Sequence, residues 1–295
     1  MEKPVKTYSG INKTGIRYLE DNISIRYFHP AADLRLFIKY YWIVQVKDTK
    51  NFSKLSQISP SGYPELIFHF GDCVSVCCLD ERIPNVSYDS FIAGQITQPI
   101  QLQFKNNIRS LCVKLQPYAL KALFNIKSSE FTNRATSLNE INPKMKKNIY
   151  DQLSVANNDN MRIGIIENHL RKLLKTNSDS INPETCDAVN YLKNNINRNT
   201  GGLDQLMNVS SRTMQRRIMQ NVGISPKMLE RIFRFNKAYH FLKHNRNFDL
   251  QDVSFYLGYY DLSHLINEFK EFTGSSPVNY FKKEDMYNSF FAGIS

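Results

Sequence analysis

The sequence predicts an α+β protein with a β-rich, sandwich- or barrel-like N-terminal domain, a helical connector and an all-α C-terminal domain. Short apolar or alternating segments separated by turn formers fill residues 16 to about 116, helical periodicity begins at Pro117, and a second helical region follows a polar stretch at 176–183. At 295 residues the chain is also long for a single core. We therefore divide it into a sensing or assembly domain (1–135), a connector (136–180) and a helical domain (181–285).

The expected strands of the first domain are rich in β-branched and aromatic residues. Segments such as "KYYWIVQV", "ELIFHF" and "RSLCVKL" are bounded by "SPSGYP", "GD" and "KNN", which is typical of an antiparallel sandwich or barrel. A small effector would bind inside this domain, where concave apolar space is expected. The candidate pocket residues are Tyr40, Trp42 and Phe68, and the alternative interpretation of these aromatic residues is sheet core.

An apolar stripe in the connector has two possible partners. It consists of Ile165, Ile166, Leu170 and Leu173, which recur at helical spacing. The stripe either forms a dimer seam or packs on the β-rich domain. We favour dimerisation, because a second copy would add affinity for a bipartite ligand.

The first of two helix–turn–helix patterns is "LDQLMNVSSRTMQRRIMQNVG". Asn208 stands where the turn needs a residue that tolerates left-handed backbone, and Ser210 is expected to cap the second helix. Met214 and Ile218 then face inward. The outward face carries Arg and Gln, which can pair with two atoms of guanine and of adenine respectively. Its candidate DNA contacts are Ser211, Arg212, Gln215, Arg216 and Arg217.

Ser225 and Pro226 begin a helix of about 19 residues and roughly 28 Å. Such a rod can set two reading helices about one duplex turn, ~34 Å, apart. The second pattern, "LQDVSFYLGYYDLSHLINEFKEFTG", follows, with Gly258 in the turn and Asp261 as the cap. Its candidate DNA contacts are Leu262, Ser263, Ile266, Asn267 and Lys270.

Residues 184–282 resemble the DNA-binding domain of the AraC/XylS family of bacterial transcription regulators. The resemblance rests on "SPKMLERIFRFNKA", "LGYYDLSHLINEFKEFTG" and "SSPVNYF" in this order. It implies two helix–turn–helix units on one long helix, with recognition helices in successive major grooves. It also implies base-facing positions for Arg212, Gln215, Arg216, Ser263 and Asn267.

The chain departs from the family pattern at several positions. Asn267 stands where the family often has Arg, and Asp204 stands where a small Ala usually packs. Gly201 and Gly202 weaken the start of the first unit by roughly 1 kcal/mol each. The N-terminal part resembles, more loosely, the β-rich domain of one branch of the family, and such domains bind small effectors, dimerise or both.

The charge of the helical domain is unevenly distributed. The chain carries +11 in total, and residues 205–243 hold eight bases and one acid, whereas residues 244–295 hold four bases and seven acids. Glu268 and Glu271 in the second recognition helix would repel DNA. We therefore expect the basic segment to anchor phosphates while the second helix reads bases through neutral side chains.

Other classes of protein find little support in the sequence. Five scattered cysteines indicate a reducing cytoplasm, and neither a signal peptide nor an apolar run of about 18 residues is present. His69, Cys73, Cys77 and Cys78 are close in sequence, but strand alternation separates them, so we favour buried side chains over a metal site. Nucleophile and nucleotide-binding motifs are absent, so we expect no enzyme and no cofactor.

The sequence thus predicts a cytoplasmic, sequence-specific transcription regulator that binds promoter or operator duplex DNA. We expect a homodimer, with control by a small effector or by dimerisation through the N-terminal part, and RNA polymerase as a further candidate partner. The rival interpretation is a degenerate relative that acts as a protein-binding adaptor or anti-regulator without DNA binding. A steep salt dependence of duplex binding would separate the two.

Overall fold

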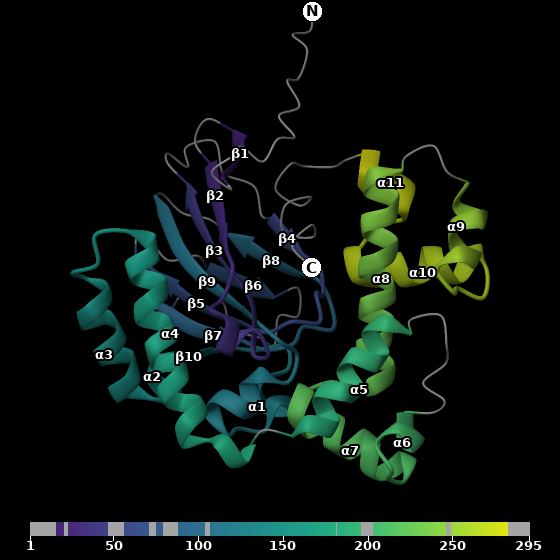
Figure 1. The fold of residues 1–295 in the computed structure, drawn as a ribbon. Coiled ribbons are helices and arrows are strands. Elements are labelled where there is room, and N and C mark those ends of the chain that lie inside the picture. The colour runs from purple at the N-terminus through teal and green to yellow at the C-terminus, as the bar shows by residue number, and fades with distance from the viewer. Residues whose placement is uncertain are drawn as a thin grey trace, which may run out of the picture.

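The protein is represented by a computed structural model, in which a β-rich part precedes a helical part (Figure 1), as the sequence predicts. It describes residues 16–20, 23–46, 56–70, 75–78, 88–103, 107–180, 182–195, 203–245 and 249–282. The strands are β1 (Ile16–Glu20), β2 (Ile23–Phe28), β3 (Ile38–Val46), β4 (Ser56–Ile58), β5 (Glu65–His69), β6 (Ser75–Cys78), β7 (Ser90–Ala93), β8 (Ile100–Gln103), β9 (Ile108–Leu115) and β10 (Ala135–Ser137). Cys73 lies outside the described residues.

The strands form two antiparallel sheets that face each other. The larger sheet has the order β1-β2-β3-β9-β5-β7-β10 and the smaller sheet the order β4-β8-β6. In the larger sheet, β3 and β9 pair in the centre, with Trp42 opposite Cys112. Side chains that point between the sheets form one hydrophobic core, to which Trp42, Val44, Phe91 and Cys112 belong. Neighbours in sequence such as Tyr41 and Ile43 point to the opposite side, because successive side chains of a strand alternate.

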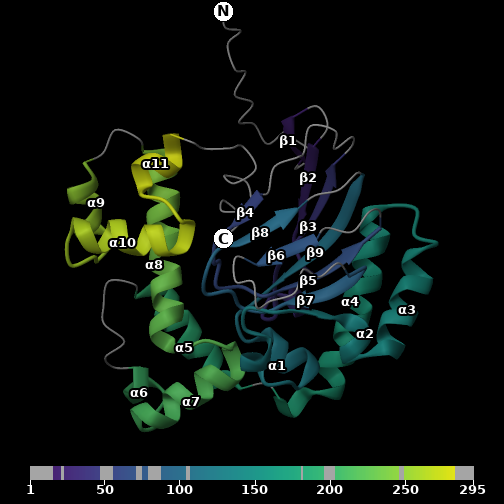
Figure 2. The same cartoon turned by 180° about the vertical axis from the view of Figure 1, so that it is seen from behind.

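Helices cover that opposite side of the larger sheet. They are α1 (Ala119–Phe124), α2 (Leu138–Ile141), α3 (Pro143–Leu153) and α4 (Asp159–Thr176), with the 3-10 turns η1 (Ala32–Leu34), η2 (Ser128–Phe131) and η3 (Ser178–Ser180). Figures 1 and 2 show α4 and α3 beside the sheet on the side away from the C-terminal helices.

The apolar stripe of α4 packs within the chain. Ile166 and Leu170 are fully buried in the core beneath the large sheet. Ile165 and Leu173 are partly buried against the same core. The prediction of a dimer seam on this stripe is therefore wrong, and the alternative, packing within the chain, is what the structure shows. The error has a simple cause, since helical periodicity reports that a face is apolar but not which surface covers it.

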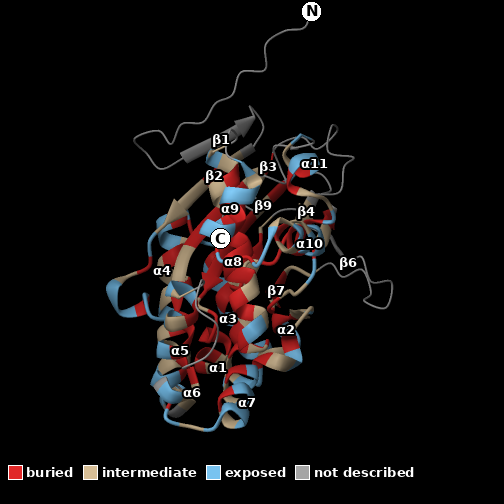
Figure 3. Ribbon diagram, turned by 90° about the vertical axis from the view of Figure 1, so that its right-hand side faces the viewer, coloured by how far each residue is buried: buried red, intermediate tan, exposed pale blue. Residues whose placement is uncertain are grey.

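The C-terminal helices are arranged around one long rod. They are α5 (Pro183–Asn194), α6 (Leu203–Leu206), α7 (Ser211–Val222), α8 (Pro226–His244), α9 (Leu250–Tyr256), α10 (Leu262–Thr273) and α11 (Pro277–Lys282). In Figures 1 and 2, α7 lies at one end of α8, and α10 and α11 lie toward the other end. Figure 3 shows most of α8 buried, because it packs against other elements on several sides.

The signals that start and end these helices behave as the sequence predicts. Asn208 has a left-handed φ of 48°, and the turn glycine Gly258 has a φ of 74°. The side chains of Ser210, Ser225 and Asp261 cap α7, α8 and α10 by accepting from Thr213 N, Met228 N and His264 N. Among the described residues, no helix is both long and apolar enough to cross a membrane.

Candidate nucleic-acid interface

The outward face of α7 is open to solvent. Met214, Ile218 and Val222 are buried on its inner side, which orients the helix. The side chains of Arg212, Gln215 and Arg216, which alternate with these residues around the helix, are exposed. The structure therefore leaves the predicted base-reading side chains of the first unit accessible.

Two further candidates of the first unit have partners within the protein. The Ser211 hydroxyl donates a short hydrogen bond to the carboxylate of Asp204, which stands at the start of α6. Asp204 also accepts from the backbone N–H of Gln205, at 2.9 Å. Arg217 forms a short ion pair with Glu184 of α5. A DNA contact by Ser211 or Arg217 would have to compete with these bonds.

The outward face of α10 is neutral in its middle. Ser263 and Asn267 are exposed, and Ile266 is half-buried between them. Leu262 is also half-buried and packs against the core. Lys270 is exposed in the last turn. The second unit thus offers two polar base-reading side chains, with one cation at the end of the helix.

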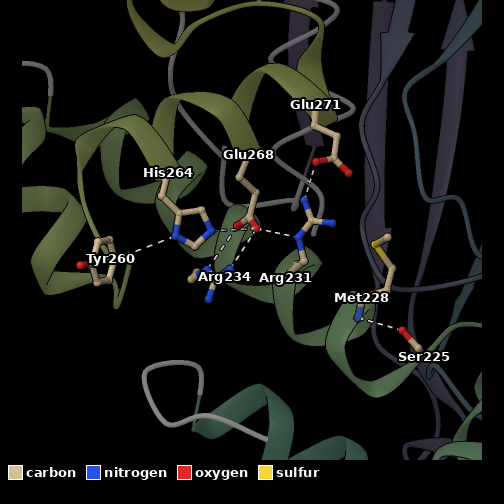
Figure 4. A network of polar contacts seen from close by, with 8 residues as sticks. All are labelled: Ser225, Met228, Arg231, Arg234, Tyr260, His264, Glu268 and Glu271. Carbon is tan, nitrogen blue, oxygen red and sulfur yellow. Dashed lines mark hydrogen bonds and ion pairs between the residues drawn. The ribbon is translucent and has the colours of Figure 1, made fainter.

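Glu268 and Glu271 of α10 form ion pairs with arginines of α8 (Figure 4). The Glu268 side chain is only 1% exposed and accepts from Arg231 Nε at 2.8 Å and from Arg234 Nη2 at 2.9 Å. Glu271, which is 48% exposed, pairs with the other end of the Arg231 guanidinium. The third acid, Asp261, caps the helix at its N-terminus. Each carboxylate is thus compensated inside the protein, which reduces its repulsion of a phosphate backbone.

Burial and pairing act in opposite directions on these arginines. Burial lowers the pKa of Arg234, but the hydrogen bond and charge of Glu268 outweigh it and raise that pKa above its usual value. The Arg234 guanidinium also lies 4.8 Å from the ring centroid of Tyr259, a favourable cation–π distance. Arg231 and Arg234 therefore hold α10 on α8.

This pairing corrects the expected role of the basic segment. We expected its cations to anchor phosphates as a group. In the structure, however, Arg231 and Arg234 form ion pairs with Glu268 and Glu271, and Arg217 forms an ion pair with Glu184. The sequence could not show this, because the partners lie more than thirty positions away. The exposed cations of the segment are Arg212, Arg216, Lys227 and Lys237.

A cavity lies between the two sheets of the β-rich domain. Its walls are mainly apolar and come from both sheets, with a cavity volume of about 120 Å³. Apolar lining residues are Trp42, Ile58, Ile67, Phe91, Ile100 and Leu102. Its polar lining includes His69 with Ser110 and, elsewhere, Glu65 with Lys114. The described residues contain no group of three or more His, Cys, Asp or Glu side chains that could hold a metal ion.

His69, in the cavity wall, has one ring nitrogen bonded and one without a hydrogen-bond partner among the described residues. Its Nδ1 lies 2.6 Å from Ser110 Oγ. Its Nε2 is buried and has no partner among the described residues. Burial lowers the pKa of His69 to about 4, although the charge of Asp89 opposes the shift, so the ring is neutral near pH 7. A neutral imidazole can exchange one more hydrogen bond with a group in the cavity.

Three lysines surround Tyr63 where the β-rich domain meets α5. Lys39 Nζ is 3.8 Å from the centroid of the Tyr63 ring, and Lys114 Nζ and Lys193 Nζ are each 6.0 Å from it. The nearby carboxylate is Glu65, whose Oε1 is 3.1 Å from Lys114 Nζ. Burial lowers the pKa of Lys39 to about 7, and the charges of Lys114 and Lys193 lower it further, while Glu65 opposes them. An anion would relieve this excess of positive charge.

The predicted pocket residues have different positions. Trp42 lines the cavity. Phe68 is fully buried in the core on the helix side of the sheet, so its prediction as a pocket residue is wrong, because its neighbour Ile67 takes the cavity side. Tyr40 stacks edge-to-face on Tyr27, 5.7 Å between centroids, and is not among the lining residues. Ser110, Lys114 and Glu65 also line the cavity, and the sequence did not indicate them, since only strand pairing brings them together.

Two family models match this chain. Residues 26–137 match a domain of unknown function, DUF6597, and residues 204–283 match a helix-turn-helix domain. A search of curated protein sequences gave no match.

Several solved structures are similar over part or most of the chain, all at low identity. ToxT from Vibrio cholerae O395 is 10% identical with a TM-score of 0.45, covering 89% of this chain and 98% of that one. ToxT from Vibrio cholerae strain SCE256 with an unsaturated fatty acid bound is 11% identical with a TM-score of 0.43, covering 90% and 96%. The xylose-binding transcription activator xylR is 15% identical with a TM-score of 0.31, covering 41% and 38%.

Proposed function

We propose that this chain, an AraC-type helix-turn-helix DNA-binding transcriptional regulator, reads its duplex through the outward faces of α7 and α10. The observation that carries the proposal is the exposure of polar side chains suited to base edges on both recognition helices. Both helices sit on one rigid rod, α8, which has 19 residues and is about 28 Å long. One copy of the chain therefore carries both halves of the reading surface.

The two helices contribute in different ways. Arg212 and Arg216 suit guanine, and Gln215 suits adenine, by bonds to two atoms of the base edge. On α10, Ser263 and Asn267 supply neutral hydrogen-bonding groups, and Ile266 can contact a thymine methyl group. Phosphate contacts then fall mainly to the exposed cations around them, Lys227, Lys237 and Lys270.

The test begins with the full chain and a pool of random duplexes, from which it should enrich one bipartite motif. Arg216→Ala should weaken binding to that motif by about 1–3 kcal/mol, or roughly 5- to 150-fold. Asn267→Ala should relax one base position and leave the salt dependence unchanged. Arg35→Ala, an exposed arginine of the β-rich domain, is the matched control and should change neither.

The same assay decides against a protein-binding adaptor. Neutralising phosphates releases counterions, so the logarithm of the binding constant should fall linearly with the logarithm of salt concentration, by about 0.9 per phosphate contacted. Enrichment of no motif, or binding without this slope, would contradict the DNA-reading function.

The cavity supports control by a small effector. Its walls are mainly apolar, and His69 Nε2 supplies a bonding position that is unfilled among the described residues. Lys114 and Glu65 line the same cavity and adjoin the lysines around Tyr63. We assign the effector to the class of small amphiphiles with an apolar body and an acidic group, because such a molecule meets both surroundings.

Matched probes test this ligand class. A panel of medium-chain and aryl carboxylates should raise the melting temperature of the full chain, whereas the corresponding primary amides should raise it less. A ligand at one hundred times its Kd stabilises the folded state by about 2.7 kcal/mol. Phe91→Trp, which fills the cavity, should abolish the shift. If no probe of the panel shifts the melting temperature at concentrations up to millimolar, the assigned ligand class is wrong.

A further inference from the structure

The last turns of both recognition helices are bonded by side chains of the β-rich half. At α7, the hydroxyl of Ser128 in η2 donates to the carbonyl of Asn221 at 2.7 Å, and the hydroxyl of Thr132 donates to the carbonyl of Gly223 at 2.6 Å. At α10, the side-chain amide of Gln57 in β4 donates to the carbonyl of Thr273 at 2.8 Å. The two attachments are equivalent although their donors are 71 to 75 positions apart in the sequence.

The carbonyls of Asn221 and Thr273 belong to the final turns, where a helix leaves C=O groups without internal partners, and Gly223 directly follows α7. The final turn of an α-helix has free C=O groups that are satisfied by water or by a capping group. Both helices end at a left-handed glycine, Gly223 with a φ of 98° and Gly274 with a φ of 71°. A Cβ on Gly223 would lie 2.8 Å from the carbonyl oxygen of Ser128, which shows how closely η2 approaches the end of α7.

A third attachment lies between them, on α8. Asn236 donates to the carbonyl of Ser61 at 3.0 Å, and the ring of Phe233 lies 5.9 Å from that of Tyr63. Gly62, with a φ of 81°, brings the loop close enough that an added Cβ would lie 2.9 Å from the Phe233 ring. The rod is thus held near its middle, and each recognition helix is held at its C-terminal end.

None of these contacts uses the outward faces of the recognition helices. Arg212, Gln215, Arg216, Ser263 and Asn267 all remain exposed while the attachments are made. The contacts therefore do not block DNA. They act on the position of each recognition helix, and the separation between the two determines which duplex spacing fits both.

We propose that Gln57, Ser128 and Thr132 are positioning residues that fix the distance and relative rotation of α7 and α10, so that the β-rich half sets the half-site spacing that the protein accepts. The proposal rests on the DNA-reading function of the two helices. One inserted base pair moves the second groove segment by ~3.4 Å and rotates it by about 34°. A helix pair held at three points cannot follow that change, whereas a pair joined by α8 alone can bend at the loops.

The experiment compares the full chain with a Gln57→Leu/Thr132→Val double variant, which removes one hydrogen-bond donor at each recognition helix with little change in size. Each protein selects from the same pool of random duplexes. The wild type should enrich two half-motifs at one spacing and lose at least about 10-fold in affinity for a one-base-pair insertion, the cost of one broken recognition contact. The variant should enrich the same half-motifs at two or more spacings and lose less than about 3-fold.

The outcomes are separable. An unchanged single spacing in the variant, with the wild-type insertion penalty, overturns the positioning role and leaves DNA reading intact. Failure of the wild type to enrich any motif overturns the DNA-reading function and the positioning role with it. Thr132→Ser keeps the hydroxyl and should match the wild type. If the double variant does not fold, Gln57→Leu alone decides, because Gln57 is half-buried in a three-residue strand, and it should still broaden the spacing.

Discussion

The ion pairs between α8 and α10 allow a quantitative comparison within one helix. Glu268 and Glu271 both bond to Arg231, but the Glu268 side chain is 1% exposed and that of Glu271 is 48% exposed. Replacing each with Gln keeps the shape and removes the charge. The two variants therefore differ mainly in how much water can replace the lost partner.

The expected loss for Glu268→Gln follows from what it leaves behind. Removing one partner of a buried ion pair costs about 3–5 kcal/mol, because the other charge stays buried without compensation. Arg234 is 11% exposed and Arg231 is 23% exposed and keeps Glu271, so water relieves part of the cost. We therefore expect about 3 kcal/mol, at the lower end of that range. Glu271→Gln should cost less than about 1 kcal/mol, as for other exposed pairs.

Two spectroscopic signals report on the two halves of the molecule. The single tryptophan, Trp42, is buried in the β-rich domain, whereas circular dichroism at 222 nm follows the helices. Urea unfolding should show the loss for Glu268→Gln in the helical signal, and thermal unfolding should show a decrease of about 6 °C, at ~2 °C per kcal/mol for a chain of this size. Coincident shifts of both signals would mean that the halves unfold together.

Equal losses for Glu268→Gln and Glu271→Gln would refute this reasoning, since burial would then not decide the cost. A loss below about 1 kcal/mol for Glu268→Gln would refute it as well, because it would place Glu268 among exposed pairs. A double-mutant cycle of Glu268→Ala, Arg234→Ala and the Glu268→Ala/Arg234→Ala double variant measures the coupling directly. The double variant should be more stable than the sum of its single losses predicts, because Glu268→Ala leaves the Arg234 guanidinium without its buried partner and Arg234→Ala removes one of the two arginines that bond Glu268.

Four further predictions follow from other buried groups. The free energy of unfolding should fall by at most about 1.4 kcal/mol per pH unit as pH drops from about 6.5 toward 4, because unfolded His69 takes up a proton while the folded ring, whose pKa burial lowers to about 4, stays neutral. Urea midpoints of the wild type and of His69→Asn at pH 7 and pH 5 check this, and equal changes in the two proteins would contradict it. Between about pH 7 and 10 stability should rise with pH, because the pKa of Lys39, lowered by burial to about 7, makes the folded amine neutral while the unfolded amine stays charged, and Lys39→Met should remove this rise in the same melts. Asp159→Asn should cost about 3 kcal/mol or more in urea unfolding, because the buried carboxylate compensates three arginines, at 2.5 Å from Arg26, 3.2 Å from Arg109 and 3.1 Å from Arg162. A loss under about 1 kcal/mol would be inconsistent with that role. Gly62→Ala should cost about 1–3 kcal/mol, because φ is 81° and the Cβ would lie 2.9 Å from the Phe233 ring, and faster amide exchange near Phe233 would locate the damage at the contact with α8.

Local signals in the sequence predicted the helical domain well, because its elements depend on neighbours. The caps Ser210, Ser225 and Asp261 and the left-handed Asn208 each act within four residues, and all four are confirmed. The 19 residues predicted for the long helix are those of α8. Such signals predict where a helix ends and which of its faces is buried, because they depend only on residues close in sequence.

Features that depend on distant partners could not be predicted in the same way. Strand alternation separates Ile67 from Phe68, but it does not say which side holds the cavity, so Phe68 was placed wrongly. A register shift between Ile38 and Tyr40 further disturbs the alternation in β3. The stripe around Leu170 is apolar as predicted, but only the folded structure shows that other residues of the same chain cover it. The pairing of Glu268 with Arg234 likewise depends on the packing of α10 against α8.

The charge distribution and the fixed spacing are two parts of one physical problem. Because Arg231 and Arg234 form ion pairs with Glu268, the second recognition helix contributes polar contacts with bases but little electrostatic attraction to phosphate. A neutral helix contributes most when the first helix has already bound and holds it near its groove, since the second contact is then intramolecular. The benefit is greatest when the separation of the helices already matches the duplex. Holding α7 and α10 from the β-rich half would supply that match, and a ligand that moves β4 or the segment around Thr132 would then change affinity for DNA without touching a base.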